Sequence, residues 1–420
     1  MAQLDAAYAY SLDAKDELSL YKDRFVSKDP ELIYLDGNSL GRLPRATTGR
    51  VQTLVEQEWG GRLIRGWGEG WFEMASRVGD KIAKIIGAQP GEVIVSDSTT
   101  VNLYKLALSA LMALPNRSKI ITDDLNFPSD VYVMQGLVDT LPGRTLHVVN
   151  SPDQIHGPIN ALRASLDENT ALLTLTHTTF KSGYTYDLAA VSALAHEVGA
   201  LTLWDFSHSA GSVPINVTDA KVDLAVGCCY KYLNGGPGAP AFLYVRKNLQ
   251  ERLKNPITGW FSQKNMFGFD LEYQPVSNIR RFMVGTPTVL SMAAVEVGVD
   301  MLVEATMEKI RAKSVQQTEY FIALYKEILQ PLGFRLNTPT DPTIRGSHVS
   351  IGHDEGWRID QALINDANVI PDFRAPDNIR LGFAPLYTSF VDIHTAVMRL
   401  RNVVTEKLYE KYSNDRSAVT

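Results

Sequence analysis

The sequence predicts an α/β protein with a doubly wound, mostly parallel sheet of seven strands and a smaller α+β domain towards the C-terminus. Short β-rich runs alternate with amphipathic helical patterns over roughly the first 290 residues. Several runs are apolar without interruption, as in strands that are covered on both faces. The pattern changes after that point, and 420 residues are enough for two domains with sizeable cores.

Seven apolar runs are expected to form the sheet, with helices between them. One helix follows Thr99, and another follows Asp187, whose side chain can accept the N-cap hydrogen bond. Gly199 is placed to end the second helix. The expected strands are 92–96, 119–122, 145–149, 171–176, 200–204, 223–227 and 240–245.

Three ranges describe the expected domains. Residues 46–290 form a large domain, residues 291–420 form a small domain, and residues 1–45 form an N-terminal arm that completes the small domain. We expect the small domain to begin with one long amphipathic helix and to contain shorter strands. The helix is expected at 291–330, and the strands at 347–352 and 378–383.

Composition excludes several classes of function. The net charge of −6 gives no electrostatic reason to bind nucleic acid or an anionic membrane surface. The N-terminus lacks the pattern of a signal peptide, and no apolar run is long enough to span a membrane, so we expect a cytoplasmic protein. The two cysteines, Cys228 and Cys229, are adjacent, read as buried strand residues, and cannot build a disulfide framework or a zinc site.

Two loops at strand ends offer groups that could bind a ligand. In "SDSTT" (96–100), hydroxyl groups precede a helix, which is typical of a phosphate site at Thr99 and Thr100. Simple N-capping is the alternative. In "NFPSD" (126–130), Phe127, Ser129 and Asp130 combine an aromatic face, a hydroxyl and a carboxylate, although a plain turn also explains this loop.

The stretch "LTLWDFSHSAG" (201–211) places Asp205 directly after a buried strand, with His208 three residues on. A carboxylate at that depth is costly unless a cation or a strong donor compensates it. Asp205 either caps the following turn or pairs with a protonated ring nitrogen of a ligand. A metal site is less consistent with the sequence, because no third ligand is evident.

Lys231 follows the next buried strand, beside glycines that allow close approach, in "CCYKYLNGGPG". An amine in a half-buried site can have a lowered pKa and form a Schiff base, whereas a solvated loop lysine is the alternative. A phosphate site, an aromatic loop, a strand-end Asp and a strand-end Lys on one sheet edge together indicate a pyridoxal phosphate site.

At this point the residues resemble a known family. The order Thr99-Thr100, Asp205-x-x-His208, Lys231 is similar to fold-type I pyridoxal phosphate enzymes of the class V aminotransferase branch. The segments "LDGNSLGRLP", "NFPSD", "WDFSHSAG", "CCYKYLNGGPGAPAFLYV" and "IRLGFAPLY" resemble kynureninase, over residues 35–387. That family hydrolyses L-kynurenine to anthranilate and L-alanine in tryptophan catabolism and NAD biosynthesis, as a homodimer whose subunits share active sites.

The resemblance implies catalytic roles for Lys231 as the Schiff-base lysine, Asp205 as the partner of the pyridine nitrogen, and Tyr230 as a proton donor or a phosphate ligand. It places eleven residues around the cofactor: Thr99, Thr100, Phe127, Ser129, Asp130, Asp205, His208, Tyr230, Lys231, Trp260 and Thr286. Trp260 and Thr286 are expected from the other subunit. The implied substrate residues are Arg380, which would clamp the α-carboxylate, with Trp67, Asn38 and Ser39.

The choice of substrate and two other functions stay open. In the family, a His and an Asn near the aryl ring favour 3-hydroxykynurenine. Trp67 and Thr286 stand at those places here, and this difference favours plain kynurenine as the substrate. A cysteine desulfurase or class V aminotransferase is the enzymatic alternative, but no cysteine follows Cys229 to act as a mobile nucleophile. A non-catalytic scaffold of this fold is disfavoured by the presence of Lys231, Asp205 and Arg380.

Overall fold

The computed structural model describes residues 4–415 and contains the expected seven-stranded sheet. Its strand order is β2-β8-β7-β6-β5-β3-β4, and every neighbouring pair is parallel except the two that involve β8. The strands are β2 (Val93–Val95), β3 (Lys119–Asp123), β4 (Thr145–Val149), β5 (Thr170–Thr176), β6 (Leu201–Asp205), β7 (Leu224–Gly227) and β8 (Phe242–Val245). The prediction of a mostly parallel sheet is confirmed.

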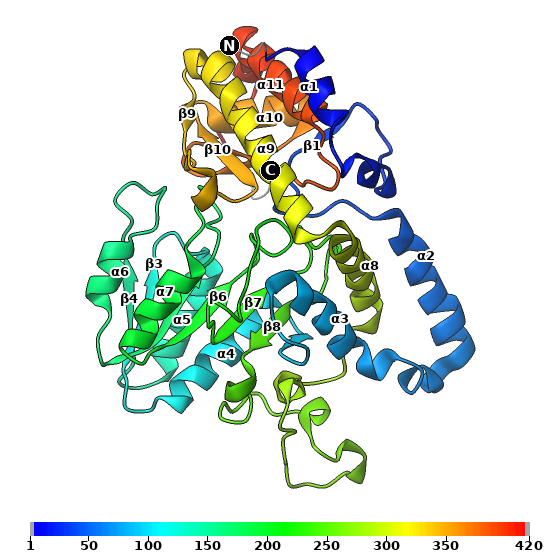
Figure 1. Ribbon diagram of the computed structural model, residues 1–420, viewed down its shortest axis with the longest axis vertical. Helices are drawn as coiled ribbons and strands as arrows, with labels where there is room; N and C mark the ends of the chain where they lie inside the picture. Colours follow the sequence, from blue (N-terminus) through cyan, green and yellow to red (C-terminus); the bar gives the residue numbers. More distant parts are fainter. Residues whose placement is uncertain (1–3, 416–420) are drawn as a thin grey trace.

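Helices pack along this sheet and cover its central strands (Figure 1). Two of them begin as their sequences predict, because Ser98 caps α4 and Asp187 caps α7 with side-chain hydrogen bonds. Gly199 follows α7 with a φ of 73°, a conformation that glycine adopts without strain. The helices of this part are α2 (Arg45–Thr53), α3 (Trp71–Ile86), α4 (Thr99–Ala113), α5 (Pro128–Thr140), α6 (Ile159–Ser165), α7 (Leu188–Glu197) and α8 (Val289–Ala305).

The expected single helix over 291–330 is two helices, α8 and α9 (Met307–Leu324). The chain breaks at Thr306, whose φ of 66° is incompatible with a continuous helix. Residues of α8 belong to the hydrophobic core of the seven-stranded sheet, whereas Tyr320 and Phe321 of α9 belong to a second core. Helix α9 therefore links the two cores, as Figure 1 shows in yellow.

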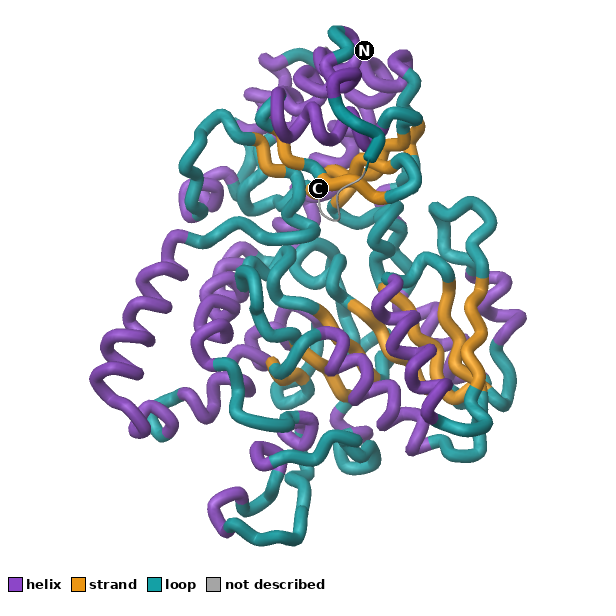
Figure 2. Tube along the Cα trace, turned by 180° about the vertical axis from the view of Figure 1, so that it is seen from behind, coloured by secondary structure: helices purple, strands orange, loops and turns teal. Residues whose placement is uncertain are grey.

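The second core lies against a four-stranded antiparallel sheet with the order β12-β13-β10-β9, separate from the first sheet in Figure 2. In the N-terminal arm, β1 pairs in parallel with β11 and α1 packs on α11, so the arm joins this second core. The domain boundaries at 45 and 290 remain a prediction. The elements are α1 (Ala6–Asp13), β1 (Ile33–Tyr34), β9 (Arg335–Leu336), β10 (His348–Gly352), α10 (Gly356–Asp366), β11 (Val369–Ile370), β12 (Asp372–Arg374), β13 (Asn378–Gly382) and α11 (Phe390–Thr405).

Within residues 4–415, no helix is both long and apolar enough to cross a membrane. The same residues contain no group of three or more His, Cys, Asp or Glu side chains arranged to hold a metal ion.

Candidate active site

The carboxyl edge of the seven-stranded sheet brings together most of the predicted site residues. Asp205 ends β6, and the chain reaches Lys231 shortly after the end of β7. Thr99 begins α4 after β2, and Asp130 lies in the first turn of α5 after β3. These four strands run in one direction, so the loops after them meet at one edge, where open α/β sheets bind ligands.

Lys231 contacts a neutral histidine. Its Nζ lies 2.9 Å from Nε2 of His208, and 5.8 and 5.9 Å from the ring centroids of Phe127 and Tyr230. Burial, followed by the positive charge of Lys231, lowers the pKa of His208 well below its ordinary value. The imidazole is therefore neutral near pH 7 and can accept a hydrogen bond from the amine. An amine placed in this way can attack a carbonyl group.

Asp205 and Asp130 form an interacting pair of buried carboxyl groups. Oδ1 of Asp205 accepts hydrogen bonds from the backbone N–H and the hydroxyl of Ser207, at 2.8 and 2.6 Å. Burial, and then the charge of Asp205, raises the pKa of Asp130 well above its ordinary value, and burial also raises the pKa of Asp205. Oδ2 of Asp130 is buried without a hydrogen-bond partner. A protonated ring nitrogen would compensate such a pair.

Two helix N-termini converge beside these carboxyl groups. Oγ of Ser98 accepts a hydrogen bond from the backbone N–H of Val101, and Oγ1 of Thr100 lies 3.4 Å from Oγ of Ser129 in the first turn of α5. Helix N-termini carry partial positive charge and free N–H groups, so this arrangement suits a phosphate. Ser98 provides the cap, which leaves the hydroxyls of Thr99 and Thr100 available for a ligand.

Arg380 is buried on β13, and its guanidinium is held from three sides. Nε donates to Oδ1 of Asp372 at 2.8 Å, Nη1 to the carbonyl of Phe180 at 2.7 Å, and Nη2 to Oγ of Ser39 at 2.8 Å and to Oδ2 of Asp372. The Asn38 oxygen, with the amide turned towards Arg380, lies 2.7 Å from Nε. Arg380, Asn38 and Ser39, predicted together as substrate residues, are therefore neighbours.

The N-terminal arm crosses directly over the lysine segment. The backbone N–H of Gly41 donates to the carbonyl of Tyr230 at 2.8 Å. A Cβ atom at position 41 would lie 2.4 Å from the carbonyl oxygen of Lys231 and 2.4 Å from Oδ1 of Asn234. This approach requires glycine at position 41, and it ties the segment that carries Ser39 to the segment that carries Lys231.

Three predicted residues lie elsewhere in this chain. Trp67 packs on Phe261, with ring centroids 5.8 Å apart, and Phe261 also contacts Trp260. Thr286 is exposed, and Trp260 is 45% exposed. None of the three contacts Lys231 or Arg380 in the described part of the chain, and the segment around Trp260 projects away from the sheet in Figure 1.

Two site residues were not found by sequence reasoning. Asp372 pairs with Arg380 across neighbouring strands, and His348 on β10 lies with its ring centroid 5.5 Å from that of His208. His348 is fully buried, and neither of its ring nitrogens has a hydrogen-bond partner. In the sequence, these two residues are marked only by the alternation of side chains between the two faces of a strand, and this alternation does not indicate a functional site.

The residues present fit pyridoxal phosphate. Lys231 would supply the amine for the aldehyde, the Asp205–Asp130 pair would face the ring nitrogen, and the N-termini of α4 and α5 would hold the phosphate. Phe127 is 39% exposed and offers a face for stacking. The unpartnered Oδ2 of Asp130 is a buried polar atom that a bound polar ligand would satisfy.

The fold and this site define a fold-type I enzyme of the pyridoxal phosphate-dependent class. The chain is similar in structure to apo cysteine desulfurase from Thermococcus onnurineus NA1, with a TM-score of 0.77, 17% identity, and coverage of 90% of this chain and 95% of that one. It is also similar to the cystine C–S lyase C-DES in complex with its product cysteine persulfide, with a TM-score of 0.76, 18% identity, and coverage of 89% and 98%. At such identities the similarity shows the fold.

Sequence comparison specifies the family. The chain is 42% identical to kynureninase of Pseudomonas fluorescens over 405 residues, which is 95% of each chain. It is 40% identical to kynureninase of Burkholderia pseudomallei strain 1106a over 419 residues, 98% of this chain and 99% of that one. The family model of the kynureninase C-terminal domain matches residues 310–400. The chain belongs to the kynureninase family.

Proposed function

We propose that this protein binds pyridoxal phosphate and hydrolyses L-kynurenine to anthranilate and L-alanine. The observation that carries the proposal is the 42% identity to a kynureninase over 95% of the chain. The site supports it, because an amine, a buried carboxyl pair and an anion site meet at one sheet edge.

Each site residue has a role in this reaction. When bound, the cofactor supplies an electron sink for negative charge at the substrate α-carbon. Lys231 takes the α-proton, and neutral His208 accepts a hydrogen bond from its amine. Asp205 keeps the ring nitrogen protonated. The contacts of Arg380 use four of its five N–H donors, so a substrate carboxylate meets the remaining one on Nη1, while the Ser39 hydroxyl holds the guanidinium in place from Nη2.

Tyr230 is the candidate acid for the last step. Water adds at the γ-carbonyl carbon, the Cβ–Cγ bond breaks, and the β-carbon of the alanine fragment needs a proton. The neighbouring Cys228 and then burial raise the pKa of Tyr230, so the phenol stays protonated at neutral pH and can donate. A hydrogen bond from Tyr230 to the phosphate is compatible with this role.

Anthranilate fluorescence tests the activity directly. The purified holoenzyme is mixed with L-kynurenine, and anthranilate and alanine should appear in equal amounts. Cofactor-loaded protein that forms no anthranilate would refute the proposal. L-Cysteine as substrate separates the desulfurase alternative, which predicts alanine and sulfide; the chain has no cysteine after Cys229 for that chemistry. Lys231→Ala is the control, and it should lose both turnover and the Schiff-base absorbance.

The preferred substrate is plain kynurenine. The apolar ring of Trp67 and the small hydroxyl of Thr286 stand where the family uses a His and an Asn for the hydroxylated substrate. Steady-state kinetics with both substrates side by side should give a higher kcat/KM for kynurenine than for 3-hydroxykynurenine. A preference for the hydroxylated compound would contradict this assignment.

The protein works as a homodimer whose active sites are shared between subunits. Trp67, Trp260 and Thr286 lie away from Lys231 within their own chain, in a region with strongly exposed apolar side chains. These exposed side chains are Trp59, Leu63, Ile64, Phe267, Phe269 and Leu271. A partner subunit would cover these side chains and receive Trp67, Trp260 and Thr286 at its own site.

Mixed dimers test this arrangement. Lys231→Ala and Trp260→Ala chains are each expected to be nearly inactive alone. After mixing and subunit exchange, about a quarter of all sites should combine two intact contributions and regain activity. No recovery in verified mixed dimers would show that Trp260 acts within its own chain or not at all.

We also place the protein in the cytoplasm and its reaction in tryptophan catabolism leading to NAD biosynthesis. Cell fractionation tests the first assignment, and growth on tryptophan tests the second.

A further inference from the structure

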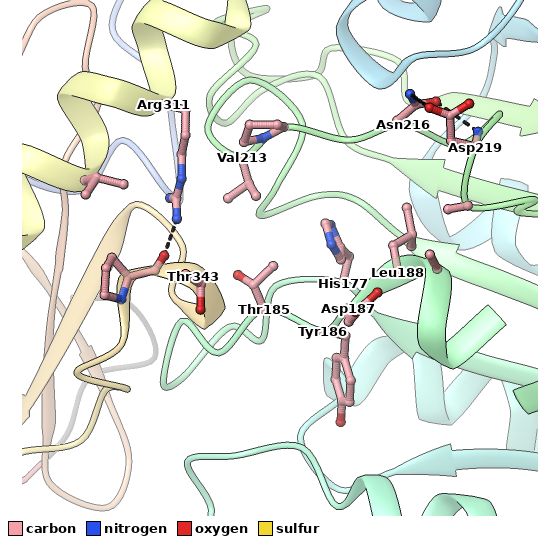
Figure 3. Close-up of a pocket in the computed structure, with 15 residues that line it drawn as sticks. His177, Thr185, Tyr186, Asp187, Leu188, Val213, Asn216, Asp219, Arg311 and Thr343 are labelled. Atoms are coloured by element: carbon pink, nitrogen blue, oxygen red, sulfur yellow. Dashed lines mark hydrogen bonds between the residues drawn. The ribbon is translucent and has the colours of Figure 1, made fainter. Parts of the chain in front are cut away.

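A cavity lies between helix α9 and the loops after β5 and β6, and none of the residues of the candidate active site lines it. Its volume is about 680 Å³. Figure 3 shows Arg311 of α9 on one side of the cavity and His177, which follows β5, on the other, with Val213 and Thr185 between them. Nothing in the kynurenine reaction requires this cavity.

Arg311 is a cation without a counter-ion in the part of the chain that the structure describes. Its Nη2 donates to the carbonyls of Pro342 and Arg345, at 2.5 and 2.9 Å, but Nη1 is buried without any partner. No carboxylate pairs with Arg311 among residues 4–415, and burial, together with the charge of Arg345, lowers its pKa to about 10. A guanidinium in this setting is stabilised by a bound anion.

The acidic residues of the cavity wall do not fill this role. Oδ1 of Asp187 accepts the N-cap hydrogen bond from Ala190, at 2.9 Å, and Oδ2 of Asp219 accepts one from Asn216, at 2.6 Å. Both carboxylates therefore have local partners at the end of the cavity away from Arg311, as Figure 3 shows for Asp219.

The opposite wall adds a buried polar group. His177 is 3% exposed, and its Nδ1 has no hydrogen-bond partner. Burial lowers its pKa to about 4, so the ring is neutral and can hydrogen-bond to a ligand of either polarity. Much of the remaining wall is apolar, with Leu188, Val213 and Val315 among its residues.

We infer that this cavity binds a small organic carboxylate with an apolar body. The carboxylate pairs with the guanidinium of Arg311, whose side chain lines the cavity, the body lies along the wall that includes Val213 and Val315, and His177 hydrogen-bonds to a polar substituent or an edge of the ligand. Charge alone favours any anion, but the apolar wall selects one that can bury hydrocarbon.

Fluorine NMR of the holoenzyme with 4-(trifluoromethyl)benzoate tests the inference. The probe should show saturable line broadening, and the neutral 4-(trifluoromethyl)benzamide should bind about tenfold more weakly or worse. Arg311→Gln should weaken benzoate binding by about tenfold or more. Val315→Phe, one turn from Arg311 on the same helix, should block binding because the larger side chain fills the cavity. This second variant keeps the inference testable if Arg311→Gln does not fold.

Arg163→Gln, on the exposed end of α6, is the matched control and should leave binding unchanged. The inference is overturned if the probe does not bind, if the amide binds as well as the acid, or if both cavity variants bind the probe as the wild type does. In that last case the probe occupies the kynurenine site and inhibits turnover competitively. It is also overturned if inorganic phosphate binds with the same dependence on Arg311 while the benzoate does not.

Discussion

Replacement of Gly41 by alanine should damage the active site without touching a catalytic side chain. The new Cβ would lie 2.4 Å from the carbonyl oxygen of Lys231, about 1 Å short of an ordinary contact. Backbone atoms cannot rotate away, so overpacking should cost about 1–3 kcal/mol of stability. The arm must instead shift by about 1 Å, and it carries the Ser39 hydroxyl that contacts Arg380.

A displacement of this size in a substrate-positioning contact corresponds to a loss of about 100-fold in rate. We therefore expect kcat/KM for kynurenine to fall about 100-fold in Gly41→Ala, measured from initial rates of anthranilate formation, with a lower urea midpoint of the holoenzyme. Gly49→Ala is the control, because a Cβ added there in α2 would meet nothing within 4 Å beyond its own stretch of helix backbone. It should keep full activity and gain about 0.5–1 kcal/mol. Activity of Gly41→Ala within about twofold of wild type would refute the reasoning.

Three other predictions concern charged groups. Asp130→Asn should cost much less activity than Asp205→Asn, because burial and the charge of Asp205 raise the pKa of Asp130 and favour its uncharged form, which an amide resembles; similar losses in both would contradict this assignment. Burial lowers the pKa of His348 in the folded protein to about 3, whereas a histidine in the unfolded chain has a pKa of about 6.5. The unfolded chain therefore binds the proton first as the pH falls, and the free energy of unfolding should decrease from about pH 6.5 towards pH 3. Urea midpoints between pH 7 and 4 measure this, and His348→Gln should flatten the curve; an equal slope in the variant would count against the buried neutral ring. Arg380→Lys should raise KM for kynurenine about tenfold or more, because an ammonium group cannot reproduce the planar fork; an unchanged KM would exclude the clamp.

Local signals in the sequence predicted the strands, the helix caps and the residues at strand ends. Asp205 and Lys231 follow uninterrupted apolar runs, so their place at the edge of a parallel sheet follows from periodicity and the direction of the strands. Asp187, whose side chain can accept an N-cap hydrogen bond, predicted the start of helix α7. These features depend on residues that are close in the chain, and they could therefore be predicted from the sequence without the tertiary structure.

Contacts between distant segments could not be read in the same way. The reversal of β8, the break at Thr306 and the pairing of Asp372 with Arg380 depend on which elements pack together. A helical period continues through Thr306, yet the backbone there turns to a φ of 66°, and only the later part of α9 reaches the second core.

By itself, the sequence determined the fold class, the lysine and its carboxylate partner, and the resemblance to one family. Only the tertiary structure decided that His208 is neutral beside Lys231, that Asp372 holds Arg380, and that Arg311 has no carboxylate partner among residues 4–415. The physical reason is that pKa values and ion pairing depend on burial and on neighbours far away in the chain. Sequence spacing carries no measure of either.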